Sequence, residues 1–366
     1  MEGIYGFTAS GQAQMSFCQA AVSRTTAIAI SDVNVPDGLD LSVVAPCYNE
    51  ALGLAEFYKR VSATCSKAVG AGYEIILVND GSKDATWSLM SELAASDAHV
   101  LAINLARNYG HQIALTAGLH YTRGKRILII DADLQDPPEL LDQMMLRMDE
   151  GADVVYGQRE VRQGETWFKR ATASLFYCLL ERLVEIEIPR DTGDFRLLSR
   201  RALSILNAMP EHDRFIRGMV SWIGLRQVPI RYVREPRFAG AGNYPVRKML
   251  RFSIDAMTGF STRPLRMASY LGAFLGGVGL LSLVYIISGV LLGRTVQGWA
   301  SVMTTVVLLS SFQLFILGIV GEYLGRLFMQ AKNRPLFVVT EILSAAEPGS
   351  RRETADPCAT LIENNR

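Results

Sequence analysis

The chain has 366 residues, a formal net charge of +1 at pH 7 and 49% hydrophobic residues. Because it carries almost no net charge, it has no overall positive field that would attract nucleic acid. Its five scattered cysteines lack metal-ligand spacing, which excludes a disulfide framework and favours a reduced, cytosol-facing protein.

Residues 1–40 show neither clear periodicity nor a signal-peptide pattern, so we expect a loosely ordered extension there. Beyond it, short apolar runs alternate with segments of helical character. Strands are expected at 41–45, 73–78, 100–104, 127–130, 153–156 and 228–233. This alternation predicts an α/β fold with a doubly wound, mainly parallel sheet.

Polar groups follow the first two predicted strands. The sequence PCYNE at 46–50 includes Tyr48, which can stack on a base, although a capped turn is the simpler interpretation. The second strand ends at Asp80, which can accept hydrogen bonds from a base or ribose. Asp84 is better placed to cap the helix that begins near Ala85.

The most distinctive pattern is RILIIDADLQDPPE at 126–139. Asp131, Asp133 and Gln135 occupy alternate positions, which in extended chain places three oxygen-bearing side chains on one face. Oxygen ligands suit Mg2+ or Mn2+, and open α/β sheets bind ligands at the carboxyl ends of their strands. Alone, such a motif is more often a capped turn; following a buried strand, it predicts a metal site. Asp136 is the expected N-cap of the next helix.

Three other residues have two interpretations each. His111 has no partner at metal-ligand spacing, so a polar residue with ordinary hydrogen bonds is favoured over a ligand. Arg159 follows a strand near the acidic site, which favours a phosphate contact over a solvated charge. Asp194 is either a turn residue or a carboxylate that returns to the active site.

Phosphate groups would have to be met by side chains and a metal. The chain has neither G-x-G-x-x-G nor G-x-x-x-x-G-K-[ST], which excludes a Rossmann dehydrogenase and a P-loop NTPase. The basic, glycine-containing segment 234–248 is a candidate lid over phosphates. It leads into 245–260, where apolar and basic residues alternate as in an amphipathic helix at a membrane surface.

Two long uncharged segments follow, at 267–293 and 297–321. Each exceeds the roughly 20 apolar residues that cross a bilayer, so we expect a transmembrane hairpin. Basic residues flank its outer ends, which by the positive-inside rule places both ends in the cytoplasm: Arg263, Arg266, Arg326, Lys332 and Arg334. The polar tail beyond Glu341 is expected to be disordered.

Taken together, these motifs resemble those of the family 2 glycosyltransferases, and within them the polyprenyl-phosphate glycosyltransferases. The resemblance runs from about Leu41 to Phe337 and includes PCYNE, VNDGSKD, RNYGHQIAL, DADLQDPPE, GQRE, TGDFRLLS and YPVRK. It implies a GT-A-type domain at 41–244, an interfacial amphipathic helix at 245–263, a transmembrane hairpin at 264–330 and a cytoplasmic tail at 331–366.

Residue roles follow from the resemblance by position. It implies metal ligands at Asp131, Asp133 and Gln135, and catalytic residues at Asp133, Asp194 and Arg159. The nucleotide-sugar donor is expected at Pro46, Tyr48, Glu50, Asp80, Asp131 and Gln135, with phosphate contacts at Arg237 and Lys248. One departure is Gly242-Asn243-Tyr244, where family members often have Gly-Ser-Lys-Tyr.

The implied activity is inverting transfer of a sugar from a nucleotide diphosphate sugar, such as UDP-glucose, to a polyprenyl phosphate such as undecaprenyl phosphate. The enzyme would use Mg2+ or Mn2+ and work at the cytoplasmic face of the inner membrane, for cell-envelope glycan synthesis or modification. A homo-oligomer such as a tetramer is also implied. Two alternatives stay open: a processive membrane polysaccharide synthase, whose Q-x-x-R-W motif is absent here, and a catalytically silent membrane adaptor.

Overall fold

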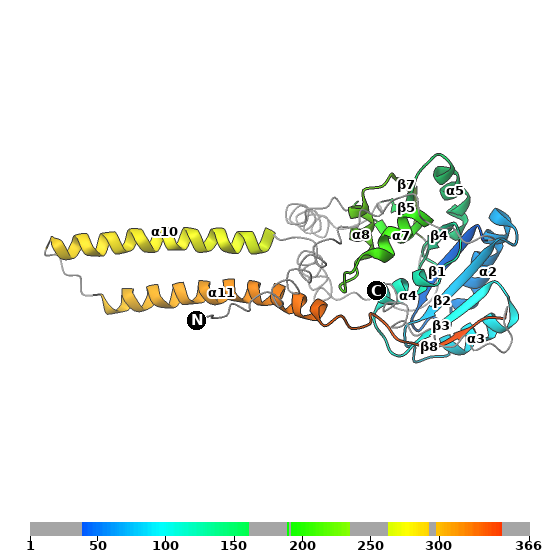
Figure 1. The fold of residues 1–366 in the computed structure, drawn as a ribbon, viewed down its shortest axis with the longest axis horizontal. Coiled ribbons are helices and arrows are strands. Elements are labelled where there is room, and N and C mark those ends of the chain that lie inside the picture. Colours follow the sequence, from blue (N-terminus) through cyan, green and yellow to red (C-terminus); the bar gives the residue numbers. More distant parts are fainter. Residues whose placement is uncertain (1–38, 161–188, 190–191, 235–262, 293–297, 346–366) are drawn as a thin grey trace, which may run out of the picture. The chain divides into compact units, whose positions relative to one another are not determined.

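The computed structural model describes residues 39–160, 189, 192–234, 263–292 and 298–345, and the expected N-terminal extension and most of the interfacial helix lie outside this set. The described strands form one sheet in the order β7-β5-β6-β4-β1-β2-β3-β8 (Figure 1). The strands are β1 (Leu41–Cys47), β2 (Tyr73–Asn79), β3 (Val100–Leu105), β4 (Arg126–Ile129), β5 (Val154–Arg159), β6 (Thr192–Ser199), β7 (Gln227–Tyr232) and β8 (Val339–Leu343).

The sheet is mixed. Its centre is parallel, because β1 pairs in parallel with both β2 and β4, and β2 pairs in parallel with β3. β6 runs antiparallel between β4 and β5, and β8 runs antiparallel to β3. The predicted α/β architecture is confirmed, and the predicted strands lie within two residues of their expected ends, except that β5 ends three residues later than expected.

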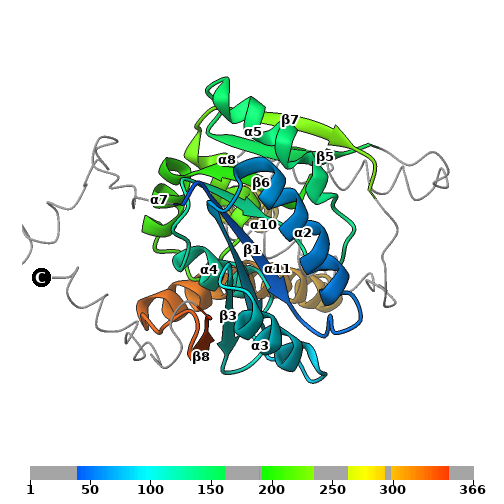
Figure 2. The ribbon, with the colours of Figure 1, turned by 90° about the vertical axis from the view of Figure 1, so that its right-hand side faces the viewer.

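Helices cover both faces of this sheet (Figure 2). One face packs against α2 (Leu54–Val69), α3 (Thr86–Ser96) and α5 (Leu141–Asp149), and the other against α4 (His111–His120), α7 (Arg200–Ala208) and α8 (Ile216–Ile223). The central strands are therefore apolar at consecutive positions: in β4, Leu128 faces the first layer while Ile127 and Ile129 face the second. This is the pattern of parallel strands buried on both sides.

A buried polar network ties the amino ends of β1 and β2 together. Glu74 is 2% exposed and accepts hydrogen bonds from the Ser42 hydroxyl (2.7 Å) and from the Arg123 backbone amide (2.6 Å). The Ser42 hydroxyl in turn accepts the Gly124 amide at 2.7 Å. These groups lie at the end of the sheet opposite the polar strand ends, so their role is structural.

Replacing Glu74 with alanine should lower the free energy of unfolding by about 2 kcal/mol, because the buried donors around it lose their acceptor. Thermal or denaturant unfolding of the full chain in detergent measures this loss. Turnover per folded molecule should stay at the wild-type level. Unchanged stability would show that water or another group takes over the lost hydrogen bonds.

Strand β8 was not predicted. The tail beyond Glu341 was expected to be disordered, and for its first two residues this prediction is wrong: Ile342 and Leu343 pair with Ile103 and Ala102 of β3. The Thr340 hydroxyl also donates to the Asn104 carbonyl at 3.1 Å. A short strand at a sheet edge draws its stability from its partner, so its own sequence gives little sign of it.

Between β7 and β8 the chain forms α10 (Arg263–Leu291) and α11 (Trp299–Ala331), which contact each other (Figure 1). Within the described residues, one segment is long and apolar enough to cross a membrane, Leu308–Ala331. The apolar part of α10 in the same set is shorter, Leu265–Leu281. The segment Leu308–Ala331 overlaps the predicted second span, 297–321, and the two-span hairpin stays a prediction.

Candidate active site

The acidic motif after β4 forms a turn. β4 ends at Ile129, Leu134 has a positive φ of 60°, and the Asp133 side chain accepts the Gln135 amide at 3.1 Å. The predicted extended geometry is therefore wrong. The predicted separation of faces nevertheless holds, because Ala132 and Leu134 are buried whereas the three oxygen-bearing side chains are partly exposed.

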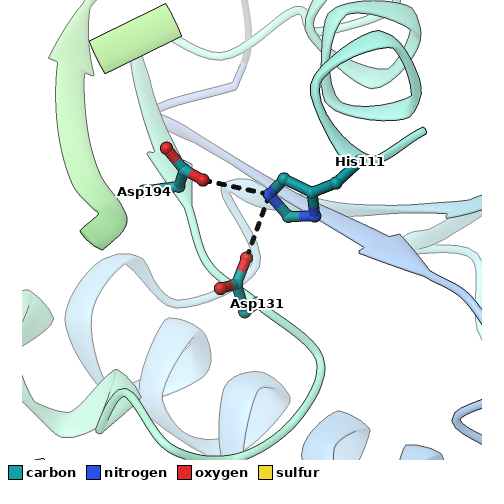
Figure 3. Close-up of side chains that lie close together, drawn as sticks. All are labelled: His111, Asp131 and Asp194. Atoms are coloured by element: carbon teal, nitrogen blue, oxygen red, sulfur yellow. Dashed lines mark hydrogen bonds and ion pairs between the residues drawn. The ribbon is translucent and has the colours of Figure 1, made fainter. Parts of the chain in front are cut away.

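Three side chains from three elements converge beside this turn (Figure 3). His111, at the start of α4, places its Nε2 3.1 Å from Asp194 Oδ2 in β6 and 3.4 Å from Asp131 Oδ1. One ligand atom from each residue lies within 4.8 Å of the others. The structure thus brings Asp131 and Asp194 together, as the active-site interpretation of Asp194 requires, and adds His111 to them.

The three side chains of this cluster shift one another's pKa values. Burial, with the nearby carboxylates, raises the pKa of Asp131 to about 6, although His111 opposes this shift. Burial by itself would lower the pKa of His111, but the hydrogen bond to Asp194 and the charge of Asp131 raise it to about 9. A raised pKa of His111 and two carboxylates beside it favour a protonated imidazole at this position.

Asp194 is 2% exposed and receives four hydrogen bonds. Arg217 donates from Nε at 2.7 Å and Nη2 at 3.1 Å, and His111 and Gln112 donate at 3.1 Å each. Despite burial, Arg217 and His111 hold the pKa of Asp194 well below its usual value. Gln112 also accepts the Ile216 amide at 3.0 Å, so it links Asp194 to the start of α8.

The loops after β1 and β2 lie together. The Asn49 amide donates to the Ser82 hydroxyl at 3.0 Å, and the Glu50 amide donates to the Thr86 hydroxyl at 2.9 Å. Asp84 was expected to cap the next helix; it lies one residue before the N-cap of α3, Ala85, and its side chain accepts the amide of the first helical residue, Thr86, at 3.0 Å. Tyr48, in the loop after β1, is 44% exposed.

Asp80 is more constrained than its sequence suggested. It is 3% exposed, and its two oxygens accept the backbone amides of Tyr109 (2.7 Å) and Gly110 (3.0 Å). Gly81 is needed beside it, since it has a φ of +65° and a Cβ there would lie 2.5 Å from the Asn108 nitrogen. Asp80 thus holds the loop that leads to His111.

Two other sequence assignments change or lie outside the structure. Asp136 is not a helix cap: it is fully buried and accepts a hydrogen bond from the Tyr232 hydroxyl, with Arg159 Nη2 3.6 Å away. Arg159 therefore lies beside the acidic turn, as predicted. Arg237 and Lys248 fall outside the described residues.

The mixed sheet, with an acidic cluster at the carboxyl ends of its parallel strands, is that of an α/β protein, and similarity to known proteins identifies its class as a glycosyltransferase. The chain belongs to glycosyl transferase family 2, whose model matches residues 42–206, and residues 263–327 match the GtrB C-terminal hairpin.

The relatives span nearly the same length. The uncharacterized glycosyltransferase YkcC of Bacillus subtilis is 44% identical over 82% of this chain and 93% of its own length. The uncharacterized glycosyltransferase sll0501 of Synechocystis is 42% identical over 83% of this chain and 96% of its own. The bactoprenol glucosyl transferase of Shigella phage SfX is 35% identical over 82% of this chain and 99% of its own length.

Proposed function

We propose that this glycosyltransferase transfers a sugar, with inversion, from a nucleotide diphosphate sugar such as UDP-glucose to a polyprenyl phosphate at the cytoplasmic face of the membrane. The observation that carries this proposal is the similarity to the SfX bactoprenol glucosyl transferase over nearly its whole length. The name of that relative specifies both a glucosyl group and a bactoprenol. The matched hairpin model at 263–327 supports an acceptor that resides in a membrane.

A divalent cation fits the acidic cluster. Asp131 Oδ1 is buried and accepts no hydrogen bond in the described part of the chain, with His111 Nε2 3.4 Å away, so a cation bound to this oxygen would stabilise the buried carboxylate. The proposed ligands are Asp131, Asp133 and Gln135, which occupy one turn. Asp194 is less available, because four donors already surround it. A bound Mg2+ or Mn2+ would offset charge on the departing diphosphate.

The acceptor needs little activation. A phosphate monoester is already anionic near neutral pH, so its oxygen can form a bond to the anomeric carbon without a strong general base. As that bond forms, the bond from the anomeric carbon to the diphosphate oxygen breaks, and its electron pair leaves with the nucleoside diphosphate. One displacement inverts the centre, so we assign Asp194 to orienting groups around it.

Other residues have proposed binding roles. Pro46, Tyr48, Glu50 and Asp80 would form the nucleotide pocket, which the joined loops after β1 and β2 support. Arg159 would contact a phosphate, because its side chain is 26% exposed beside the acidic turn. Arg237 and Lys248 are proposed to make further phosphate contacts on the ground of sequence.

The hairpin would anchor the catalytic domain in the membrane. Apolar side chains on both helices are more than half exposed, among them Phe274, Tyr285 and Phe315, and such a surface is unfavourable in water. Two membrane spans would place the catalytic domain at 41–244 and the chain after residue 331 on the cytoplasmic side. Basic residues at the outer ends of both helices support this orientation.

Membranes that contain the protein should convert radiolabelled UDP-glucose into a product that partitions into organic solvent and releases glucose in mild acid. A panel of nucleotide sugars in the same assay identifies the donor. Water-soluble polymer in place of lipid would indicate a processive synthase. No labelled product with any donor would refute the proposed transfer.

Removing divalent cations with EDTA should abolish transfer, and Mg2+ or Mn2+ in excess of the chelator should restore it, because the bound metal would offset most of the charge on the leaving diphosphate. Initial rates before and after metal addition measure this dependence. Ca2+, which prefers a larger shell of oxygen ligands, serves as the comparison ion. Full activity in EDTA would exclude a metal-dependent mechanism.

A further inference from the structure

The Arg159 guanidinium contacts two side chains that are distant from it in sequence, Tyr232 and Asp136. Its Nε donates to the Tyr232 hydroxyl at 3.2 Å, and its Nη2 lies 3.6 Å from Asp136 Oδ1. The Tyr232 hydroxyl donates in turn to Asp136 Oδ1. Arg159 and Tyr232 are register partners in the parallel strands β5 and β7, so the two side chains project beside each other.

The direction of these hydrogen bonds is fixed by chemistry. A guanidinium has only donors, so the Tyr232 oxygen must accept from Arg159, and the phenolic proton must then go to Asp136. This arrangement occupies the Nε side of the guanidinium fork. In the described part of the chain, Nη1 and the outer N–H of Nη2 have no hydrogen-bond partner, and these two donors have the spacing that binds two oxygens of one phosphate.

Two glycines make room for the arrangement. A Cβ on Gly193 in β6 would lie 2.5 Å from Arg159 Nη2. Only glycine at this position therefore lets the guanidinium pack this closely against β6. A Cβ on Gly157 would lie 2.8 Å from the Tyr232 ring. The ring itself is 5% exposed and packs edge-on against Phe195.

We infer that Tyr232 and Asp136 are positioning residues that aim the outer edge of the Arg159 guanidinium at a substrate phosphate. This inference rests on the proposed function, in which Arg159 is the residue that touches substrate. Asp136 is fully buried, and its Oδ2 has no hydrogen-bond partner among the described residues. A carboxylate retained at that desolvation cost, and turned toward one arginine, is typical of a functional site.

Tyr232→Phe is the central test, because it keeps the buried ring and removes only the hydroxyl. The KM of the substrate whose phosphate binds Arg159 should rise about 10-fold, the effect of losing one hydrogen bond to a charged group, with a smaller change in kcat. KM is measured for both the nucleotide sugar and the polyprenyl phosphate. Asp136→Asn should raise the KM of the same substrate.

Gly193→Ala gives an independent route to the same result. The added methyl meets the flexible end of Arg159, so it displaces the guanidinium with little strain in β6. It should raise the same KM without lowering the melting temperature. If Tyr232→Phe fails to fold, this variant and Asp136→Asn carry the test.

Tyr73→Phe is the matched control. Tyr73 is also 5% exposed, and its hydroxyl hydrogen-bonds to Ser62 at 2.9 Å, at the other end of the sheet. Losing that hydroxyl should leave both KM values unchanged.

The Arg159→Ala background decides the outcome. Tyr232→Phe should have no further effect on KM there, because the hydroxyl acts only through the guanidinium. If Tyr232→Phe raises KM by the same factor in the Arg159→Ala background as in the wild type, the positioning role is overturned. KM values of Tyr232→Phe, Asp136→Asn and Gly193→Ala equal to that of the Tyr73→Phe control would overturn it too. A wild-type protein that makes no lipid-linked sugar would instead refute the proposed function on which the role rests.

Discussion

Replacing Asp131 with asparagine should lower the rate of sugar transfer by about 1,000-fold or more, the largest effect we expect from a single substitution in this protein. Asparagine keeps the volume of the side chain and removes its charge. Asp131 belongs both to the proposed metal ligands and to the cluster with His111 and Asp194, so no neighbour can replace it. Initial rates of labelled lipid formation measure the loss.

A second measurement separates a lost metal site from a misfolded protein. Titration with Mn2+ should show binding at least 10-fold weaker in Asp131→Asn, while the melting temperature stays close to wild type because a buried charge has been removed. Asp142→Asn is the matched control, since Asp142 is an exposed carboxylate on α5 paired with Lys67. Wild-type turnover by Asp131→Asn would reject the metal role.

The central strands could be predicted because their signal is local. Each is a short apolar run that ends in polar residues, and burial on both faces demands that pattern. The DADLQ motif was found for the same reason: its carboxylates stand next to a strand in the sequence. Its conformation was mistaken, because alternation in sequence was taken as extended chain whereas Leu134 turns the backbone at positive φ.

The partners of these residues could not be predicted, because they come from distant parts of the chain. His111 looked like an ordinary polar residue, since both carboxylates that flank it arrive through other elements. Gln112 and Arg217 were not singled out at all. Asp136 was assigned to a cap from the Asp-Pro-Pro pattern, although its true partner, Tyr232, ends a strand formed much later in the chain.

The position of Asp194 therefore depends on contacts among three elements. β6 supplies the carboxylate, α4 supplies His111 and Gln112, and α8 supplies Arg217. Arg217 also donates to the Thr192 carbonyl at 3.2 Å, so it fixes the backbone before Asp194 as well as the side chain. Such a buried, fully paired carboxylate orients groups well but leaves a costly charge if its main partner is lost.

Arg217→Ala should accordingly lower the free energy of unfolding by about 3 kcal/mol and reduce transfer at least about 100-fold. Adding Asp194→Asn to this variant removes the buried carboxylate that has lost its main partner, so the double variant should regain about 1 kcal/mol or more of stability. Its activity should stay as low as that of Asp194→Asn alone, because the orienting carboxylate is gone. Unfolding curves and initial rates of the three variants measure both effects. A double variant less stable than Arg217→Ala would show that Arg217 supports the fold independently of Asp194, and recovered transfer would remove Asp194 from the reaction.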